Sequence, residues 1–560
     1  MNTIDLPTEV SELSPSDIGV PTDATKERED NTSQPVVTLD IPESVITSVP
    51  LTTEDSADLT QFPQLVRDLP ADVTQVDVAR AMVELNRQHI RFNPEAQKWL
   101  VFERQTGWRW DSHEDQVYQL VVETLRRLAD IVPEGLDTTK HRRFAKTRRN
   151  RTRQMENGGA IKSIIGLAAR ESSIHCEQSE IDDTPCFIGT PNGLVHLRLG
   201  EWMPYSPGWY ITRRVPVVFN PAAECPRWSR FLREILGDDE EVQDYFHQLV
   251  GYILSGETSL HKMWLLVGNG ANGKSTVLRI VQKVLGQGYA QQTPESVLMG
   301  RAHVGGATND LVRLKGVRCA LLTETGYGQS FNEERVKALV AADTIAARRL
   351  YGEFEEFTPQ AKFLLATNHL PVVRGTDKGI WRRLVVVPFT KEFEVGSDPT
   401  LFQDLVAELP GIFAWAVRGA VRWYDSNVPF TVPASWALAT NQYQNEQDAL
   451  KPFLDERVVF KSGQFVGATD LFNAYVTWCH EDGRRPLNQQ EFGHRMMDTG
   501  RVTKGRRGKS NHHHYFGAAL RVTAETEVAA QLDGLFDGQS TTPPSPSLIS
   551  PDVPLTEVTH

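Results

Sequence analysis

The clearest pattern of apolar and polar positions lies between residues 263 and 285. Residues 263–267 (MWLLV) are apolar without interruption, which is typical of a buried strand in a parallel sheet. After Lys274 the apolar residues return at the spacing of one helical face: Val277, Ile280, Val281, Val284 and Leu285. This stretch therefore predicts a strand, a glycine-rich loop and an amphipathic helix.

Similar patterns continue on both sides. Further apolar runs predict strands at residues 317–324, 362–368 and 384–387. Helical periodicity marks residues 228–236, 241–254, 401–424 and 434–443. Strands that alternate with helices are typical of an α/β fold with a parallel sheet, and we expect such a core over residues 256–445.

The flanking regions have other patterns. Residues 71–255 predict a mainly helical domain that includes a short sheet around Trp99 and Trp108, an amphipathic helix at 117–131 and a turn-rich strand region at 186–218. Residues 450–520 combine helical periodicity with a glycine-containing hairpin. We therefore expect one domain before the core and a small one after it.

Charge is concentrated in the two ends of the chain. Residues 1–70 contain 14 acidic and three basic residues, a net charge of −11, and residues 521–560 carry −5. Because the whole chain carries −13, the 450 residues between them carry +3. We expect both acidic ends to be disordered tails, and the acidic total does not exclude a polyanionic partner for the middle of the chain.

The five cysteines are widely spaced and form no C-x-x-C pair. This spacing favours neither a disulfide framework nor a cysteine-rich zinc site and indicates a reducing compartment. The acidic N-terminus lacks a signal-peptide pattern, and no apolar run approaches the roughly 18 residues of a membrane span. We expect a cytoplasmic protein, in a bacterial host if phage-encoded, with no membrane partner.

The loop after the first strand matches G-x-x-x-x-G-K-[ST] at every position and lies between a strand and a helix, as that motif requires. Backbone N–H groups and the helix N-terminus would surround phosphate oxygens, Lys274 would reach the β- and γ-phosphates, and Ser275 would bind Mg²⁺. We therefore expect ATP and Mg²⁺ as cofactors; the alternative is a chance glycine-rich turn. The expected nucleotide contacts are Gly268, Asn269, Gly270, Ala271, Asn272, Gly273, Lys274, Ser275 and Thr276.

Later residues supply candidates for the rest of the chemistry. Glu324 ends an apolar run, where a carboxylate would hold Mg²⁺ and orient the attacking water, unless it is only a polar residue leaving a strand. Asn368 ends the next run, where an amide would bond the γ-phosphate, although asparagine is also a common turn former. Arg382 or Arg383 would act as a finger on a neighbour's nucleotide, or simply form an ion pair.

With these residues assembled, the chain resembles the phage and plasmid type of primase/helicase, whose motor belongs to helicase superfamily 3. The resemblance spans roughly residues 185–520. It includes NGLVHL…GEW…YITRRVPVVFNPAAECPRWSRFL…YFHQLVGYIL before the motor and TE…VKALVAADTIAARRLYGEFEEFTPQAKFLLATNHLP…GIWRRLVVVPF within it. It implies an AAA+-like ATPase core that assembles as a ring, a homohexamer, with each site completed by the next subunit.

The resemblance also implies roles for single residues. Lys274 and Ser275 match the Walker A pair, Glu324 the second-strand acid and Asn368 the polar sensor. Of the two finger candidates, Arg383 is favoured over Arg382. Lys337, Arg348 and Arg349 fall in the segment that forms the channel hairpin of such helicases, where cations would grip the phosphates of single-stranded DNA.

The chain departs from the family in two respects. Thr323 stands where many members carry a second acid, which puts direct metal contact by Glu324 in doubt. Primases of this family also have an upstream polymerising domain of a few hundred residues with paired carboxylates for two metals. Only about 180 residues separate the acidic end from the motor here, and most of them belong to the pre-motor domain, so we expect no such polymerising domain.

Two cationic segments are candidates for DNA contact. Residues 140–153 contain eight Lys or Arg residues, which would follow a phosphate backbone or form a solvated helix face lying against the acidic tails. Residues 450–520 resemble the C-terminal winged helix of such proteins, and Lys504, Arg506 and Arg507 would contact duplex backbone from its wing, unless this is a solvated loop. Three consecutive histidines, at 512–514, cannot all face one metal ion from a strand.

The sequence leads to one preferred function and two alternatives. The preferred function is an ATP-dependent DNA helicase in phage or mobile-element replication, acting on single-stranded and forked DNA, with other replication proteins as possible partners. The first alternative is an origin-binding ATPase that acts as an initiator without processive unwinding. The second is a bifunctional primase/helicase with an unrecognised polymerising site in residues 80–185.

Overall fold

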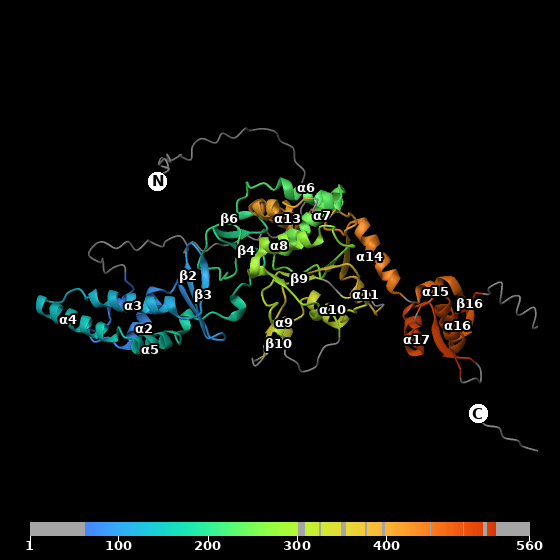
Figure 1. The fold of residues 1–560 in the computed structure, drawn as a ribbon. Helices are drawn as coiled ribbons and strands as arrows, with labels where there is room; N and C mark the ends of the chain where they lie inside the picture. Colours follow the sequence, from blue (N-terminus) through green and yellow to red (C-terminus); the bar gives the residue numbers. More distant parts are fainter. Residues whose placement is uncertain are drawn as a thin grey trace, which may run out of the picture. The chain divides into compact units, whose positions relative to one another are not determined.

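The computed structural model describes residues 62–300, 309–323, 326, 328–348, 354–375, 378–394, 398–448, 450–484, 486–507 and 512–521. Its helices and strands are labelled in Figure 1. Most of the two acidic segments for which we expect disorder lies outside these ranges, as do Glu324 and Arg349. The disordered segment predicted for residues 1–70 extends too far, because α1 (Gln64–Arg67) already forms a helical turn in which Val66 is buried.

The region before residue 182 combines four longer helices with a small antiparallel sheet. The helices are α2 (Gln75–Leu85), α3 (Asp115–Asp130), α4 (Thr138–Met155) and α5 (Gly158–Ala168). The strands β1 (Ile90–Asn93), β2 (Lys98–Glu103) and β3 (Gly107–Asp111) pair in that order. Two 3₁₀ turns follow, η3 (Ser172–Ile174) and η4 (Gln178–Glu180). The sheet around Trp99 and the amphipathic helix after it are confirmed.

A second antiparallel sheet and two helices lead to the core. The sheet contains β4 (Phe187–Thr190), β5 (Gly193–His196) and β6 (Glu201–Met203). Helix α6 (Pro226–Leu236) begins at a proline, and α7 (Glu240–Leu254) is capped by Asp239, whose side chain accepts from two N–H groups of its first turn. Both helices lie within two residues of their predicted bounds.

The core is a sheet of five parallel strands in the order β13-β7-β12-β9-β8. Its strands are β7 (Met263–Val267), β8 (Ala290–Gln292), β9 (Cys319–Thr323), β12 (Lys362–Thr367) and β13 (Leu384–Pro388). In register, Val267 pairs with Thr367 on one side and Pro388 on the other. The segments that follow these strands therefore leave from one edge, as the apolar runs predict.

Alternate residues of β7, β9, β12 and β13 enter two different hydrophobic cores. In β7, Trp264 and Leu266 pack into one core with residues of α7, α8 (Lys274–Tyr289) and α13 (Leu409–Tyr424). Met263 and Leu265 pack into the other core, which includes Tyr443 of α14 (Ala434–Gln447). Figure 1 shows α7, α8 and α13 gathered side by side. Burial on both faces explains why the strands are apolar without alternation.

Shorter elements connect the strands. They are η5 (Glu295–Val297), α9 (Asn309–Val312), α10 (Glu333–Val340), the hairpin of β10 (Ile345–Arg348) and β11 (Phe354–Phe357), α11 (Lys378–Trp381) and α12 (Leu401–Ala407). The helical region predicted at 401–424 contains two helices, α12 and α13, which meet at Glu408.

Helices α7 and α13 meet at a seam of glycines. A Cβ atom on Gly251 would lie 2.0 Å from the backbone nitrogen of Ala420, and one on Gly419 would lie 2.2 Å from the carbonyl oxygen of His247. Only glycine permits such an approach of two backbones.

The C-terminal region has its own core and sheet. It contains α15 (Lys451–Arg457), β14 (Val458–Gly467), α16 (Ala468–Glu481), α17 (Gln489–Asp498), β15 (Thr503–Arg506) and β16 (His513–Leu520). The strands pair antiparallel in the order β14-β16-β15. The expected helices and the hairpin of β15 and β16 are confirmed.

Candidate functional site

The glycine-rich loop connects β7 to α8 at the carboxyl edge of the parallel sheet. A Cβ atom on Gly268 would lie 2.2 Å from Nδ2 of Asn272 and 2.4 Å from the carbonyl oxygen of Phe389, so only glycine fits there. Gly270 and Gly273 have φ angles of +104° and +86°, which favour glycine. Gly273 is the N-cap of α8, so the loop ends where the free N–H groups of a helix begin.

Lys274 occupies the first turn of α8 with its side chain turned back into the loop. Its Nζ donates to the carbonyl oxygen of Gly268 at 2.5 Å, to Oδ1 of Asn272 at 3.1 Å and to Oδ1 of Asn368 at 3.4 Å. Lys274 is only 5% exposed, and this burial lowers its pKa. All three of these partners are neutral, and no carboxylate of a described residue is bonded to the ammonium group.

Two amides beside this lysine come from different segments. Asn368 directly follows β12 and is exposed, and its Oδ1 reaches Lys274 across 94 residues of sequence. Asn272 is buried, and its Nδ2 has no hydrogen-bond partner among the described residues. The structure thus brings the predicted lysine and the predicted strand-terminal amide together.

The predicted metal ligands are only partly described. Ser275 is exposed in the first turn of α8, and Thr276, next to it, is half-buried. Glu324 lies outside the described residues, but Thr323, directly before it, ends β9 and pairs in register with Ala366 of β12. Within the described ranges, no three His, Cys, Asp or Glu side chains cluster as a metal site would require.

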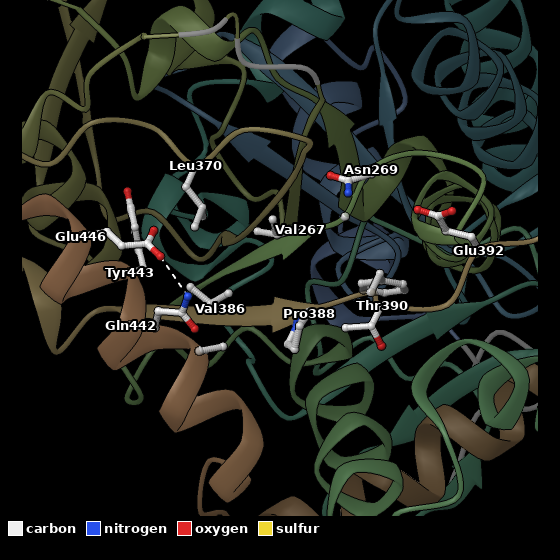
Figure 2. Close-up of a pocket in the computed structure, with 13 residues that line it drawn as sticks. Val267, Asn269, Leu370, Val386, Pro388, Thr390, Glu392, Gln442, Tyr443 and Glu446 are labelled. Carbon is white, nitrogen blue, oxygen red and sulfur yellow. Dashed lines mark hydrogen bonds between the residues drawn. The ribbon is translucent and has the colours of Figure 1, made fainter. Parts of the chain in front are cut away.

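A cavity of about 400 Å³ adjoins the start of the glycine-rich loop. Figure 2 shows Val267 and Asn269 on one side of it and Gln442, Tyr443 and Glu446 of α14 on another. Leu370, Val386, Pro388 and Ala439 supply apolar walls. Nε2 of Gln442 donates to Glu446 at 2.9 Å along the rim.

Sequence reasoning missed the contribution of α14 to this cavity. Its lining residues follow the loop by more than 160 positions, and α14 reaches the site only because it packs along β13. Glutamine and glutamate at helical spacing look like an ordinary solvated face, so no sequence signal pointed to them.

The two finger candidates lie at the opposite, amino edge of the sheet. The backbone N–H of Met263, at the start of β7, donates to the carbonyl oxygen of Arg383. Arg383 is only 8% exposed and its Nη1 donates to the carbonyl oxygen of Gly379, whereas Arg382 is exposed. Arg383 is thus buried and bonded within its own chain, whereas Arg382 presents its side chain at the surface, so this geometry favours Arg382; which of the two acts as a finger stays a prediction.

The predicted DNA contacts of the core fall on two elements. Arg348 ends β10 of the β10–β11 hairpin, and its guanidinium lies 5.1 Å from the ring centre of Phe354 on β11. Lys337 lies in the last turn of α10 and not on the hairpin, which corrects its expected place. Arg349 lies outside the described residues.

The C-terminal candidates lie at the β15–β16 hairpin. Lys504 and Arg506 belong to β15, with Nζ of Lys504 5.8 Å from the ring centre of Tyr515. Arg507 directly follows β15 and lies 3.5 Å from the ring centre of Phe465 on β14. Arg506 and Arg507 are exposed, so both present charge at the surface.

No helix within the described ranges is both long and apolar enough to span a bilayer.

Two family descriptions match the chain. Residues 79–237 match "D5 N terminal like", and residues 266–383 match "Family of unknown function (DUF5906)". The second match begins in β7 and ends at Arg383, so it contains the glycine-rich loop, Lys274 and Asn368.

Several viral proteins are similar in sequence. The chain is 34% identical over 246 residues to "Putative helicase L207/L206" of Acanthamoeba polyphaga mimivirus, which covers 43% of this chain and 25% of that protein. It is 24% identical over 411 residues to "Putative primase C962R" of African swine fever virus (isolate Pig/Kenya/KEN-50/1950), covering 66% and 42%. It is 25% identical over 222 residues to "Putative helicase 121R" of Invertebrate iridescent virus 3, covering 38% and 24%.

The chain spans between about a quarter and two fifths of the length of these relatives. Among solved structures, "The A form apo structure of NrS-1 C terminal region-CTR" matches with a TM-score of 0.45 and 12% identity, covering 79% of this chain and 98% of that one. The family matches and the viral relatives agree with one another: the chain carries D5 N-terminal-like and DUF5906 domains, and its relatives are of the viral primase/helicase type.

Proposed function

We propose that this chain is an ATP-dependent DNA helicase of superfamily 3 that acts in DNA replication and moves along single-stranded DNA as a ring. Its relatives are named helicases and primases in large DNA viruses, which supports a helicase- or primase-like role in replication. ATP hydrolysis, the AAA+-like core and the ring, a homohexamer, are part of the proposal.

One observation carries the proposal: the buried ammonium of Lys274 is bonded to neutral groups at the end of a glycine-rich loop. A buried cation that no carboxylate of the described residues neutralises favours an incoming anion, and the free N–H groups in the first turn of α8 also favour one. A triphosphate would replace the neutral partners, and Ser275 in the same turn would hold Mg²⁺.

The cavity beside the loop supports a nucleoside triphosphate over inorganic phosphate. Its apolar walls and few polar groups are those of a pocket for a planar organic ring, and it opens next to Asn269. A nucleotide whose base lay between β13 and α14 would extend its phosphates toward the glycine-rich loop.

The position of Arg382 supports action between subunits. It lies at the amino edge of a sheet whose carboxyl edge holds Lys274, and a five-residue strand is about 16 Å long. Arg382 therefore cannot reach the nucleotide of its own chain, but its exposure would let it reach that of a neighbour. In the proposed ring, Arg348 and Arg349 of the hairpin and Lys337 of α10 would contact the DNA strand, and Glu324 would complete the metal site.

The central test is Lys274→Ala, with Lys283→Ala as its matched control because Lys283 is exposed on the same helix. Removing a positioned cation from the phosphate site should lower the rate of ATP hydrolysis by about 10²-fold or more. Lys283→Ala should leave it unchanged. The measurements are Mg²⁺-dependent ATP hydrolysis with single-stranded DNA and strand displacement on a forked duplex; undiminished strand displacement by Lys274→Ala would refute the proposal.

A second candidate function is an origin-binding ATPase that acts as an initiator without processive unwinding. The C-terminal sheet and helices favour it, because Lys504, Arg506 and Arg507 lie together on a hairpin suited to duplex backbone as the wing of a winged helix. ATP-stimulated binding to forked DNA without strand displacement would select this function over the first.

A third candidate function is a bifunctional primase/helicase, because one group of relatives is named primase. Template-dependent primer synthesis by the purified chain would establish it, although we expect none.

A further inference from the structure

Helix α4 carries a continuous cationic surface that the proposed ATP cycle does not use. Its 18 residues include eight Lys or Arg and no Asp or Glu. One face is buried against α3 and contains Arg148, Thr152 and Met155. The sequence suggests eight equivalent cations, but Arg148 is fully buried and donates to the carbonyl oxygens of Leu69 and Leu128, so it holds the helix in place.

The remaining cations are arranged in a stripe. Arg142, Lys146, Arg149 and Arg153 follow one another at intervals of four, three and four residues, and this set is called the α4 stripe below. At 100° per residue these positions lie within about 60° of one another, centred about 120° around the helix from the buried face, and extend over about 16 Å. Arg143 flanks the stripe, and all five side chains are exposed.

Few acidic groups neutralise this surface. Arg149 lies 3.0 Å from Asp130, and Lys140, at the start of the helix, lies 3.2 Å from Asp137; both pairs are exposed and therefore weak. Arg142, Arg143, Lys146 and Arg153 have no ion-pair partner among the described residues. Like charges three and four positions apart repel one another, so these cations destabilise α4 unless an anion binds to them.

We propose that the α4 stripe binds the phosphate backbone of duplex DNA, independently of base sequence. Duplex DNA presents one negative charge per about 1.7 Å of its axis, so a stripe of about 16 Å faces many phosphates. The exposed face carries no Phe, Tyr or Trp on which an unstacked base would rest: Phe144 is half-buried and lies under the guanidinium of Arg148, 4.9 Å from its ring centre. This surface lies within the D5 N-terminal-like match and needs no bound nucleotide.

The test compares two quadruple variants of the full chain without nucleotide. One changes Arg142, Arg143, Lys146 and Arg153 to Gln, which keeps a good helix former at each position. The control changes Arg87, Lys98, Lys162 and Arg170 to Gln, four exposed cations of the same region outside α4. Fluorescence anisotropy of a labelled duplex between about 50 and 200 mM salt gives affinity and its salt dependence.

The quadruple α4 variant should bind duplex at least about tenfold more weakly at the lower salt, and the slope of log affinity against log salt should fall by about 2 to 4, since each lost phosphate contact removes about 0.9. The control should bind as the native chain does. A smaller variant, Lys146→Gln with Arg153→Gln, should lose about half as much slope, so that a folding defect in the larger variant leaves the proposal testable. Circular dichroism reports the helix content of each.

Three results would overturn the inference. Equal duplex affinity of the two quadruple variants would remove α4 from the DNA surface. Loss of single-stranded DNA binding alone would assign the stripe to the unwound strand. Unchanged or increased duplex binding, with faster proteolysis of residues 1–56, would identify the acidic N-terminal segment as the true occupant. Because ATP hydrolysis is not measured, failure here is separate from failure of the ATPase proposal.

Discussion

The two edges of the parallel sheet hold buried cations in different ways. At the amino edge, Lys362 begins β12 and Nζ bonds three backbone carbonyl oxygens, those of Ser255, Glu257 and Gln360. At the carboxyl edge, Lys274 bonds one backbone carbonyl and two side-chain amides beside an exposed loop. Burial lowers the pKa of both lysines, and that of Lys362 is lowered further by the nearby charge of Arg318.

The difference teaches that burial of a cation does not by itself mark a binding site. Carbonyls fixed in the backbone cannot turn away, so Lys362 ties the end of α7 to the sheet and serves the fold. The amide side chains of Asn272 and Asn368 can rotate, and the loop around them opens to solvent. A cation whose neutral partners can be replaced can bind an anionic ligand. A cation whose partners are fixed in the backbone stabilises the fold.

The largest expected effect separates the two arginines of the amino edge. Arg382→Ala should lower ATP hydrolysis by the assembled protein by about 10³-fold, because the exposed guanidinium would no longer stabilise the transition state in a neighbouring site. Arg383→Ala should instead lower thermal stability, because Arg383 is buried. Steady-state hydrolysis as a function of protein concentration, with thermal unfolding of each variant, distinguishes them; equal loss of rate in both would contradict the assignment.

The next effect tests the two lysines directly. Lys362→Met should lower the apparent free energy of unfolding by about 3 kcal/mol, because one buried and two partly buried carbonyls lose their donor. Lys274→Met should lower it by less than about 1 kcal/mol, since water can reach the loop. Thermal unfolding without nucleotide provides the measurement, with Lys283→Met as the exposed control. A similar loss for Lys274 and Lys362 would show that both are structural.

The smallest effect concerns pH. The folded Lys362 has a pKa well below 10.5, so in the range beneath 10.5 the unfolded chain binds more protons at this residue than the folded chain does. The free energy of unfolding of the native chain, relative to Lys362→Met, should therefore rise with pH in that range, by at most about 1.4 kcal/mol per pH unit. Denaturant unfolding between about pH 8 and 10 checks the sign; a fall in this difference would mean that the folded ammonium is stabilised.

The sequence predicts the strands around the site well, and the reason is physical. A strand buried on both faces must be apolar throughout, and such runs locate β7, β9, β12 and β13 within about two residues. The loop motif predicts the side chain that turns back into the loop, because the spacing from Gly268 to Lys274 is part of the motif.

What the sequence could not supply depends on packing. Arg382 and Arg383 are neighbours with the same charge, and only the direction each side chain takes before β13 separates an exposed arginine from a buried one. Arg148 looks like any other cation of α4 until two backbone carbonyls are found beside it. The wall that α14 gives the cavity arises from tertiary contact alone.

The glycine seam between α7 and α13 has a mechanical consequence. Where the two backbones touch at these glycines, no side chains lie between them that could change rotamer and let the helices slide. We therefore expect α7 and α13 to move together as one rigid unit. Helix α7 precedes the glycine-rich loop in the chain, and α13 follows the last core strand. Any swing that nucleotide exchange produces would have to pivot outside this joint.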